Sequence, residues 1–204
     1  MKTICLCLPE YPDQIEAAKK HFEESGLYDV EFFWGINAEV AGLATEHPYE
    51  RDNPGTGFKI GYKCTGIWLS HYMLWSALSR GNEEHYMILE TDAKFLDGWK
   101  QKLDDALKII PTNFDFLYPG HCCVEGHAHT VSGNGMFGEV WETKSIQCSH
   151  CYIVRRWTLQ FMLRTLRKIW APIDIQMQLE CFPYLKTYAI IPRIVEQFNT
   201  VISP

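Results

Sequence analysis

The sequence predicts an α/β fold, in which helices alternate with the strands of a mostly parallel sheet. Residues 3–8 and 30–36 are short apolar runs, typical of strands buried on both faces of a sheet. Residues 12–24 lie between them and carry apolar side chains at helical spacing. Strand, helix and strand in this order form a βαβ unit. We see no repeat or low-complexity linker in the 204 residues, so we expect a single domain over residues 1–204.

The same alternation continues along the chain. Residues 61–80 form the strongest predicted helix, with a broad apolar stripe and Gly81 just past its end. Asp97 is a candidate cap for the helix that follows. We expect strands over 85–89, 114–118, 143–154 and 187–191, helices over 97–107, 155–169 and from 172 onward, and long loops over 37–60 and 120–138. Long loops in compact domains are often functional.

Composition excludes some classes of function. The formal net charge of -6 argues against general affinity for nucleic acid. No apolar run approaches the length of a membrane span. The apolar start of the chain is too short for a secretory signal, so we expect a cytoplasmic protein with reduced cysteines, most of them in the core. Five cationic residues in the helix expected over 155–169 are typical of a solvated face.

An apolar strand that ends in two acids is the clearest candidate for a binding site. Residues 85–89 lead directly into Glu90, Thr91 and Asp92. Ligands of open α/β sheets bind at the carboxyl ends of strands, and residues two apart share one side of an extended chain. Carboxylate oxygens suit Mg²⁺ or Mn²⁺ together with a phosphate. The alternative is an ordinary polar turn that binds nothing.

Several short stretches, in this order along the chain, make it resemble glycosyltransferase family 25, the lipopolysaccharide and procollagen galactosyltransferase group. The stretches are residues 30–38, 60–71, 86–93, 114–120, 151–154, 172–174 and 192–197, followed by Ser203. The resemblance spans residues 3–203. Two features depart from the family. Glu90-Thr91-Asp92 stands where the family has Glu-Asp-Asp, and the loop over 120–138 has no counterpart.

The resemblance implies a GT-A-like (Rossmann-like) nucleotide-sugar-binding fold. It also implies transfer of a hexose, galactose or glucose, from a UDP-sugar donor to a hydroxyl of a glycan, a protein or another acceptor, with inversion and with lipopolysaccharide biosynthesis as a setting. The cofactor is expected to be Mn²⁺ or Mg²⁺. The residues implied in donor binding are Gly61, Ser70, His71, Glu90, Thr91 and Asp92, and those implied in metal binding are Glu90 and Asp92. His150, in the strand expected after the second loop, is a further candidate that could complete the metal shell from across the site.

Displacement at a sugar carbon also needs a base that takes the proton from the acceptor hydroxyl. Asp174 is the candidate, because the family has an acid at the corresponding place after Pro172. An Asp at the start of a helix more commonly caps that helix. Both roles stay open on the sequence alone.

Two alternative functions compete with the transferase. Cys148 and Cys151 form a C-x-x-C pair, and the loop over 120–138 adds His121, Cys122, Cys123, His127 and His129, so a zinc-stabilised binding protein is one alternative. The C-x-x-C pair, however, falls within an expected strand. The second alternative is a sugar- or nucleotide-binding module of the same fold with weak or no catalysis, because Glu90-Thr91-Asp92 has one acid fewer than the family pattern.

Overall fold

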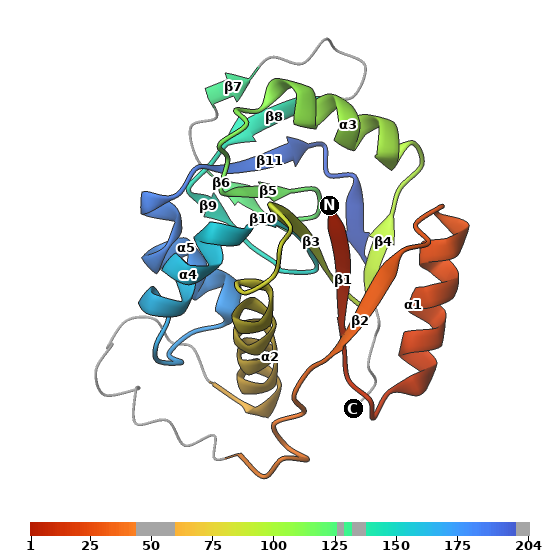
Figure 1. The fold of residues 1–204 in the computed structure, drawn as a ribbon, viewed down its shortest axis with the longest axis vertical. Coiled ribbons are helices and arrows are strands. Elements are labelled where there is room, and N and C mark those ends of the chain that lie inside the picture. Colours follow the sequence, from red (N-terminus) through yellow and green to blue (C-terminus); the bar gives the residue numbers. More distant parts are fainter. Residues whose placement is uncertain (44–59, 126–128, 132–137, 199–204) are drawn as a thin grey trace.

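The computed structural model describes residues 1–43, 60–125, 129–131 and 138–198, and it has three layers, with one mixed sheet between two layers of helices (Figure 1). The order of the strands in the sheet is β2-β1-β3-β10-β5-β11-β8-β7. Strands β2, β1, β3, β5, β11 and β7 run in one direction, and β10 and β8 run in the opposite direction. The expected α/β fold with a mostly parallel sheet is therefore confirmed.

The bounds of the strands follow. The central sheet contains β1 (Lys2–Cys7), β2 (Val30–Trp34), β3 (His85–Glu90), β5 (Phe116–Tyr118), β7 (His129–Val131), β8 (Glu139–Glu142), β10 (Cys151–Arg155) and β11 (Thr187–Ile191). Two small antiparallel pairs lie outside it, β4 (Ala93–Phe95) with β12 (Val195–Gln197), and β6 (Val124–Glu125) with β9 (Ser145–Ile146).

The helices form two layers because each buries an apolar stripe on one face of the sheet. Their bounds are α1 (Pro12–Glu24), α2 (Tyr62–Leu78), α3 (Trp99–Ile109), α4 (Arg156–Thr165) and α5 (Ile173–Glu180), with a 3₁₀ turn over Phe182–Tyr184. One core cluster includes Trp75 of α2, Met162 of α4 and Met177 of α5. The other includes Phe22 of α1 and Leu103 of α3. Helices α1 and α2 therefore lie on opposite faces of the sheet.

Between β1 and β3 lies a switch point, where the order in which strands are added across the sheet reverses. From β1 the chain crosses through α1 to β2 on one side, and from β2 it returns through α2 to β3 on the other side of β1. Right-handed crossovers in opposite directions place their helices on opposite faces. The register pairs Leu6 with Glu90, so the acids predicted to bind a ligand follow the strand at this switch point. Open α/β sheets bind their ligands at such points.

The strand expected over residues 143–154 is confirmed only at residues 145–146 and 151–154, so a single continuous strand is wrong. The chain forms β8 and β9 first, then a turn over residues 147–150, and only then β10. Cys148 in this turn has a φ of 76°, the left-handed region that a strand residue does not adopt. Cys148 and Cys151 of the C-x-x-C pair therefore belong to different local structures, a turn and a strand.

The helix expected over residues 97–107 is present but begins later, as α3. Its N-cap is Gly98, with a φ of 73°, and not Asp97. No side chain caps this end of the helix. Glycine suits the position because a left-handed backbone costs it nothing. The helix expected over 155–169 is present as α4, but it ends four residues early, at Thr165.

The cysteines divide into three groups, one of which is Cys64 and Cys123, free and not buried. Cys5, Cys7, Cys151 and Cys181 are free and buried, as expected for core residues. Cys122 and Cys148 form a disulfide, so the expectation of reduced cysteines is wrong for this pair. Among the helices that the structure describes, none is long and apolar enough to cross a membrane.

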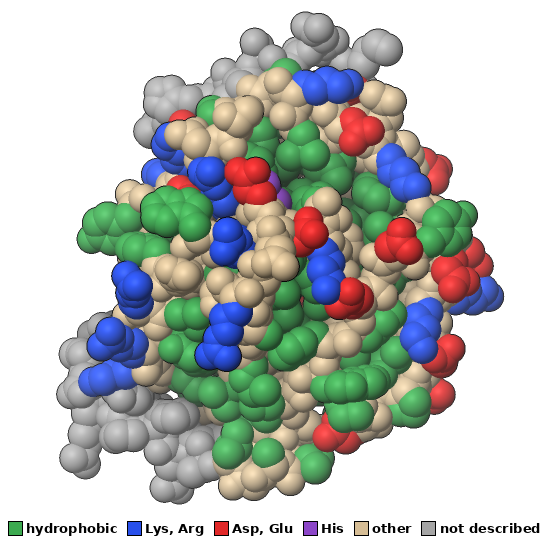
Figure 2. All heavy atoms as spheres, viewed as in Figure 1, with side chains coloured by type: hydrophobic (Ala, Val, Ile, Leu, Met, Phe, Trp, Pro, Cys, Tyr) green, Lys and Arg blue, Asp and Glu red, His purple; other side chains and the backbone are tan. Residues whose placement is uncertain are grey.

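Three of the five cationic residues in the helix expected over 155–169 are exposed, as a solvated face requires, and Arg156 is half-buried. Arg164, Arg167 and Lys168 are exposed, and Figure 2 shows Lys and Arg side chains gathered on the side of the molecule where α4 and α5 lie. Arg155 is half-buried and pairs with Glu84 at 3.2 Å.

Candidate active site

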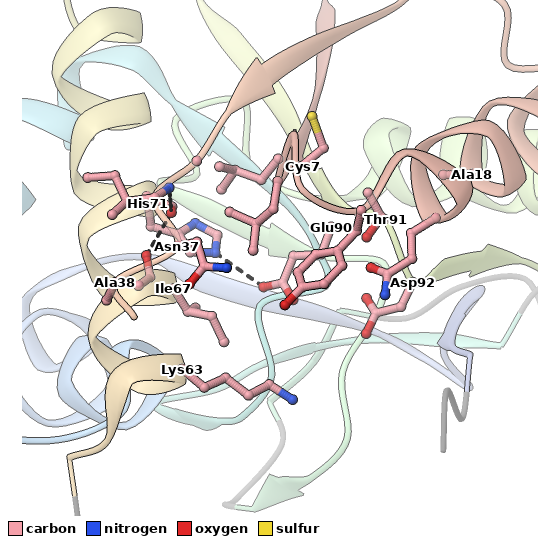
Figure 3. A pocket seen from close by; sticks show the side chains of 18 of the residues that line it. Cys7, Ala18, Asn37, Ala38, Lys63, Ile67, His71, Glu90, Thr91 and Asp92 are labelled. Carbon is pink, nitrogen blue, oxygen red and sulfur yellow. Dashed lines mark hydrogen bonds and ion pairs between the residues drawn. The ribbon is translucent and has the colours of Figure 1, made fainter. Parts of the chain in front are cut away.

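A cavity of about 720 Å³ opens at the switch point between β1 and β3 (Figure 3). Its floor is the carboxyl end of β1, and its walls come from the first turns of α1, the loop after β2, one face of α2 and the loop after β3. The residues predicted to bind the donor that line it are Ser70, His71, Glu90, Thr91 and Asp92. The acid-ended strand therefore reaches a cavity large enough for a substantial ligand.

Close contact between α2 and the loop after β2 shapes one wall. A Cβ atom on Gly66 would lie 2.6 Å from the Ile36 carbonyl oxygen, so only glycine lets the helix approach this far. The Ser70 hydroxyl accepts the Ile36 N–H at 2.7 Å and donates to the Gly66 carbonyl at 2.6 Å. Ser70 lines the cavity, but its hydroxyl is engaged in docking the helix.

His71 connects the cavity to the core. It is 1% exposed, and its Nδ1 lies 2.9 Å from the Tyr152 hydroxyl, which also accepts a hydrogen bond from Trp75 Nε1 at 2.8 Å. Since Trp75 only donates, the Tyr152 proton is available for His71 Nδ1. His71 Nε2, 3.2 Å from Glu90 Oε1, then carries the proton that it donates to the carboxylate. This chain of bonds fixes the direction in which the imidazole faces Glu90.

Glu90 is held as a carboxylate. Burial raises its pKa, but the hydrogen bond and electrostatic attraction of His71, the hydrogen bond from Ser149 and the electrostatic attraction of His150 together bring the pKa below the ordinary value. Ser149 Oγ donates to the same Oε1 atom at 2.5 Å. One oxygen of Glu90 is thus already engaged by two donors.

Asp92 is in the opposite condition. Burial and the nearby charge of Glu90 raise its pKa to about 6, against a smaller lowering by the hydrogen bond from Gln197. Gln197 Nε2 donates to Oδ2 at 2.7 Å, whereas Oδ1 is buried and has no hydrogen-bond partner among the described residues. A cation at Oδ1 would pair this buried oxygen, and a carboxylate oxygen of this kind suits a hard cation.

Two of the predicted binding residues lie outside the described lining of the cavity. Gly61 is the exposed N-cap of α2. His150, predicted to complete the metal shell, is 1% exposed and faces the Val195 carbonyl, 3.5 Å from its Nε2. Its part in a metal site with Glu90 and Asp92 stays a prediction.

Asp174, predicted as the base, is also absent from the described lining. It lies in the first turn of α5, where Pro172 is the N-cap. Its Oδ2 accepts the Cys148 N–H and its Oδ1 accepts the Ile175 N–H, each at 2.9 Å. Asp174 therefore fixes the segment over residues 147–150 in addition to bonding the first turn of its own helix. Its role as a base stays a prediction.

Sequence reasoning missed several residues of the site. Lys63 extends from α2 on the same wall as His71, and Asn37 follows β2 (Figure 3). Residues three or four apart share one face of a helix, as Lys63, Ile67 and His71 do. Helical periodicity was therefore a signal that Lys63 lies on the same face as His71. No local signal indicated Ser149 or Gln197, because they meet Glu90 and Asp92 across separations of 59 and 105 residues.

Comparison with known proteins shows the family. The model of "Glycosyltransferase family 25 (LPS biosynthesis protein)" matches residues 15–177. The chain belongs to glycosyltransferase family 25. The match covers α1, the loop after β2, α2, the acid-ended strand and the start of α5, which confirms the resemblance seen in the sequence.

Curated relatives agree with membership of family 25. A glycosyltransferase 25 family member of Aedes aegypti is 30% identical over 128 residues, and a protein of Acanthamoeba polyphaga mimivirus named as a putative glycosyltransferase is 27% identical over 115 residues. These matches cover 55% and 54% of this chain. They cover only 20% and 34% of the relatives, so the chain corresponds to a part of each.

One solved structure extends the likeness to the fold. It is a glycosyltransferase involved in the glycosylation of the major capsid of PBCV-1, with a TM-score of 0.51 and 11% sequence identity. The match covers 98% of this chain and 92% of that one. At this identity the likeness concerns the fold alone, and it supports the GT-A-like expectation for this family 25 chain.

Proposed function

We propose that this chain is a glycosyltransferase that binds a nucleotide-sugar in the cavity between β1 and β3 and transfers the sugar to an acceptor hydroxyl. Family membership supports the reaction class, and the position of the cavity at the switch point of the sheet supports donor binding there. The proposed donor is a UDP-hexose, with galactose or glucose as the sugar, and the acceptor is a hydroxyl of a glycan or a protein.

Asp92 is the observation that carries this proposal. A half-buried carboxylate with a pKa of about 6 and an orphaned oxygen fits a hard divalent cation, Mn²⁺ or Mg²⁺. Glu90 is the second candidate ligand, directly or through water, because its other oxygen is not engaged by His71 or Ser149. Such a cation, held by Asp92 and Glu90, would supply positive charge that stabilises the leaving diphosphate.

Other residues of the cavity suit the remaining parts of a nucleotide-sugar. Lys63 supplies a positive charge on the wall that faces the acids, where a diphosphate would lie (Figure 3). Tyr11 and Tyr62 line the cavity and are 44% and 42% exposed, so their rings are available to stack on a base. His71 keeps Glu90 ionised and oriented.

The experiment is a donor screen with a matched pair of variants. UDP-, GDP- and dTDP-sugars are tested with Mn²⁺, Mg²⁺ or a chelator, with release of the nucleoside diphosphate as the measurement. We expect Mn²⁺-dependent release from a UDP-sugar, lost in Asp92→Asn and kept in Asp97→Asn, whose carboxylate is exposed and outside the cavity. Equal release by wild type and Asp92→Asn would refute the metal assignment.

A binding module without turnover is the second candidate. It is favoured by the state of Glu90, whose Oε1 is engaged by two donors, so that Asp92 is left as the only acid of the pair with an orphaned buried oxygen. The same screen separates the two functions. A module predicts metal-dependent thermal stabilisation by the nucleotide-sugar with no release of diphosphate in any acceptor mixture.

A further inference from the structure

Three potential metal ligands come together behind the cavity, at the turn over residues 147–150. Cys122, Cys148 and His150 each offer one ligand atom, and these atoms all lie within 4.8 Å of one another. Zinc binds sulfur at about 2.3 Å and imidazole nitrogen at about 2.0–2.1 Å, so ligand atoms in a tetrahedral site lie roughly 3.5–4 Å apart. Cys122 and Cys148 are joined by a disulfide in this structure, so their sulfur atoms can reach this tetrahedral spacing only in the reduced chain.

His150 provides an independent observation. Its side chain is 1% exposed, and its Nδ1 has no hydrogen-bond partner among the described residues. A Cβ atom on Gly120 would lie 2.5 Å from Nε2, so the ring packs tightly against a position that only glycine leaves open. Buried polar atoms are normally paired, and a metal ion is one way to pair an imidazole nitrogen.

The backbone holds the two cysteines together without relying on their disulfide. Cys122 N–H donates to the Gln147 carbonyl at 3.2 Å, and Gln147 N–H donates to the Cys123 carbonyl at 3.1 Å. Val124 pairs with Ile146 in the β6–β9 ladder. Two further bonds fix the turn itself, from Cys148 N–H to Asp174 and from Ser149 to Glu90. The sulfur atoms of the reduced chain are therefore expected to stay side by side.

We propose that the reduced chain binds one thiophilic divalent cation, with Zn²⁺ as the reference ion, through the thiolates of Cys122 and Cys148 and the imidazole of His150. Cys122 is exposed, which leaves a fourth position open to water. Disulfide and metal-bound forms exclude each other, because both use the same sulfur atoms. This site differs from the C-x-x-C site considered from the sequence, since Cys151 belongs to the core cluster under α1 and α3.

The proposed site differs from the Asp92 site in its two thiolate ligands, and it assigns the His150 imidazole to this site in place of the Asp92 site. Thiolates and imidazole select soft or borderline cations, whereas carboxylates select Mg²⁺ and Mn²⁺. Zinc binding is also measured without a nucleotide-sugar, so its failure would leave the proposed glycosyltransferase function untouched. Loss of donor turnover would equally leave the zinc site untouched.

The test uses metal-free protein reduced with a phosphine that does not bind zinc. Zinc affinity and stoichiometry are measured by competition with a chromophoric chelator, and Co²⁺ is added separately to detect thiolate-to-metal charge-transfer absorption. We expect one Zn²⁺ per chain in wild type and in Cys123→Ser, whose exposed free cysteine is next to Cys122. Cys122→Ser and Cys148→Ser should each bind zinc about a hundredfold more weakly or worse. The disulfide form of wild type should bind none at this site.

Two results would overturn the proposal. One is equal zinc affinity in reduced wild type and Cys122→Ser. The other is loss of zinc in Cys123→Ser, which would assign the ion to different ligands. Circular dichroism and thermal unfolding check that the variants are folded. If Cys148→Ser fails to fold, the Cys122→Ser variant decides, because its side chain is exposed and outside the core.

Discussion

The two parts of the chain before and after Asp92 contribute to the cavity in different ways. Every described residue that lines it lies between Leu6 and Asp92, apart from Phe198. The part after Asp92 instead provides partners for the lining side chains. Tyr152 contacts His71, Ser149 contacts Glu90 and Gln197 contacts Asp92. The first part therefore supplies most of the lining of the proposed donor site, and the second part contacts and orients its polar side chains.

Substitutions in the two parts of the chain should therefore differ in how their effects depend on pH. A change at a first-part residue that only contacts the ligand should act at every pH at which the protein is folded. Changes in the second part alter pKa values and geometry, and their effect should depend on pH or on metal concentration.

Asp174 is the residue that would break this division, because it lies in the second part and is our candidate base. If it takes the proton of the acceptor, Asp174→Asn should leave donor binding nearly unchanged and reduce turnover by roughly a hundredfold or more. Turnover and donor affinity are measured separately, with a saturating acceptor.

Asp174→Ala is the companion variant. It removes both backbone hydrogen bonds of the carboxylate, whereas Asn keeps an oxygen that can accept the Cys148 N–H. Loss of these contacts alone should cost about 1 kcal/mol of stability. Near wild-type turnover in the Asn variant, together with earlier melting of the Ala variant, would refute the base role and leave Asp174 as the residue that holds the turn over 147–150.

His71→Leu tests the contact between the two parts of the chain. The change removes the bonds to Tyr152 and Glu90 at similar side-chain volume, so the pKa of Glu90 should rise and turnover should fall by about 10- to 100-fold. The acid limb of the pH–rate profile should move to higher pH. His85→Leu is the control. His85 begins β3, the strand that ends at Glu90, and its ring stacks on Phe114, outside the lining of the cavity. An unchanged acid limb in His71→Leu would show that the histidine does not control Glu90.

The first part of the chain could be predicted closely from sequence because its signals are local. The helix over residues 12–24 has the predicted bounds, and the apolar run before Glu90 forms the expected buried strand. Both patterns depend on neighbours a few residues apart. Glu90 and Asp92 could be assigned to a site for the same reason, since the carboxyl end of a buried strand is a defined place in this fold.

The second part was predicted less well because long-range contacts decide it. Residues 143–154 have the composition of a strand, yet Cys148 adopts a left-handed conformation. Its N–H bonds Asp174, 26 residues away, and its sulfur bonds Cys122, again 26 residues away. Neither partner is visible in the local pattern. The opposite pKa shifts of Glu90 and Asp92 could not be predicted either, because they arise in the folded state, from burial and the contacts of Glu90 with His71 and Ser149, and from burial of Asp92 beside Glu90.

Gln197→Leu sharpens the comparison from the second part. Without this hydrogen bond the pKa of Asp92 should rise above about 6, so protons compete more strongly with the metal. We expect the apparent affinity for Mn²⁺ to fall about tenfold near neutral pH and to recover at higher pH. Glu196→Gln, on the adjacent position of β12, is the control. A loss that is the same at all pH values would mean that Gln197 contacts the donor or metal directly.

The smallest expected effect concerns the stability of metal-free protein. Burial and the charge of Glu90 raise the pKa of Asp92 from an ordinary value of 3.8 to about 6, so the folded state holds a proton that the unfolded state releases. The stabilisation from this proton is complete below the unfolded pKa and is lost as pH rises through about 6.

Asp92→Asn has no such loss, because its side chain stays neutral. The melting temperature of wild type relative to this variant should therefore fall by a few degrees between about pH 4 and pH 7, and Mn²⁺ near neutral pH should raise it again in wild type only. Asp97→Asn should follow wild type throughout. Parallel curves for wild type and Asp92→Asn would mean that Asp92 is ordinarily solvated, and the case for a cation at its Oδ1 would be lost.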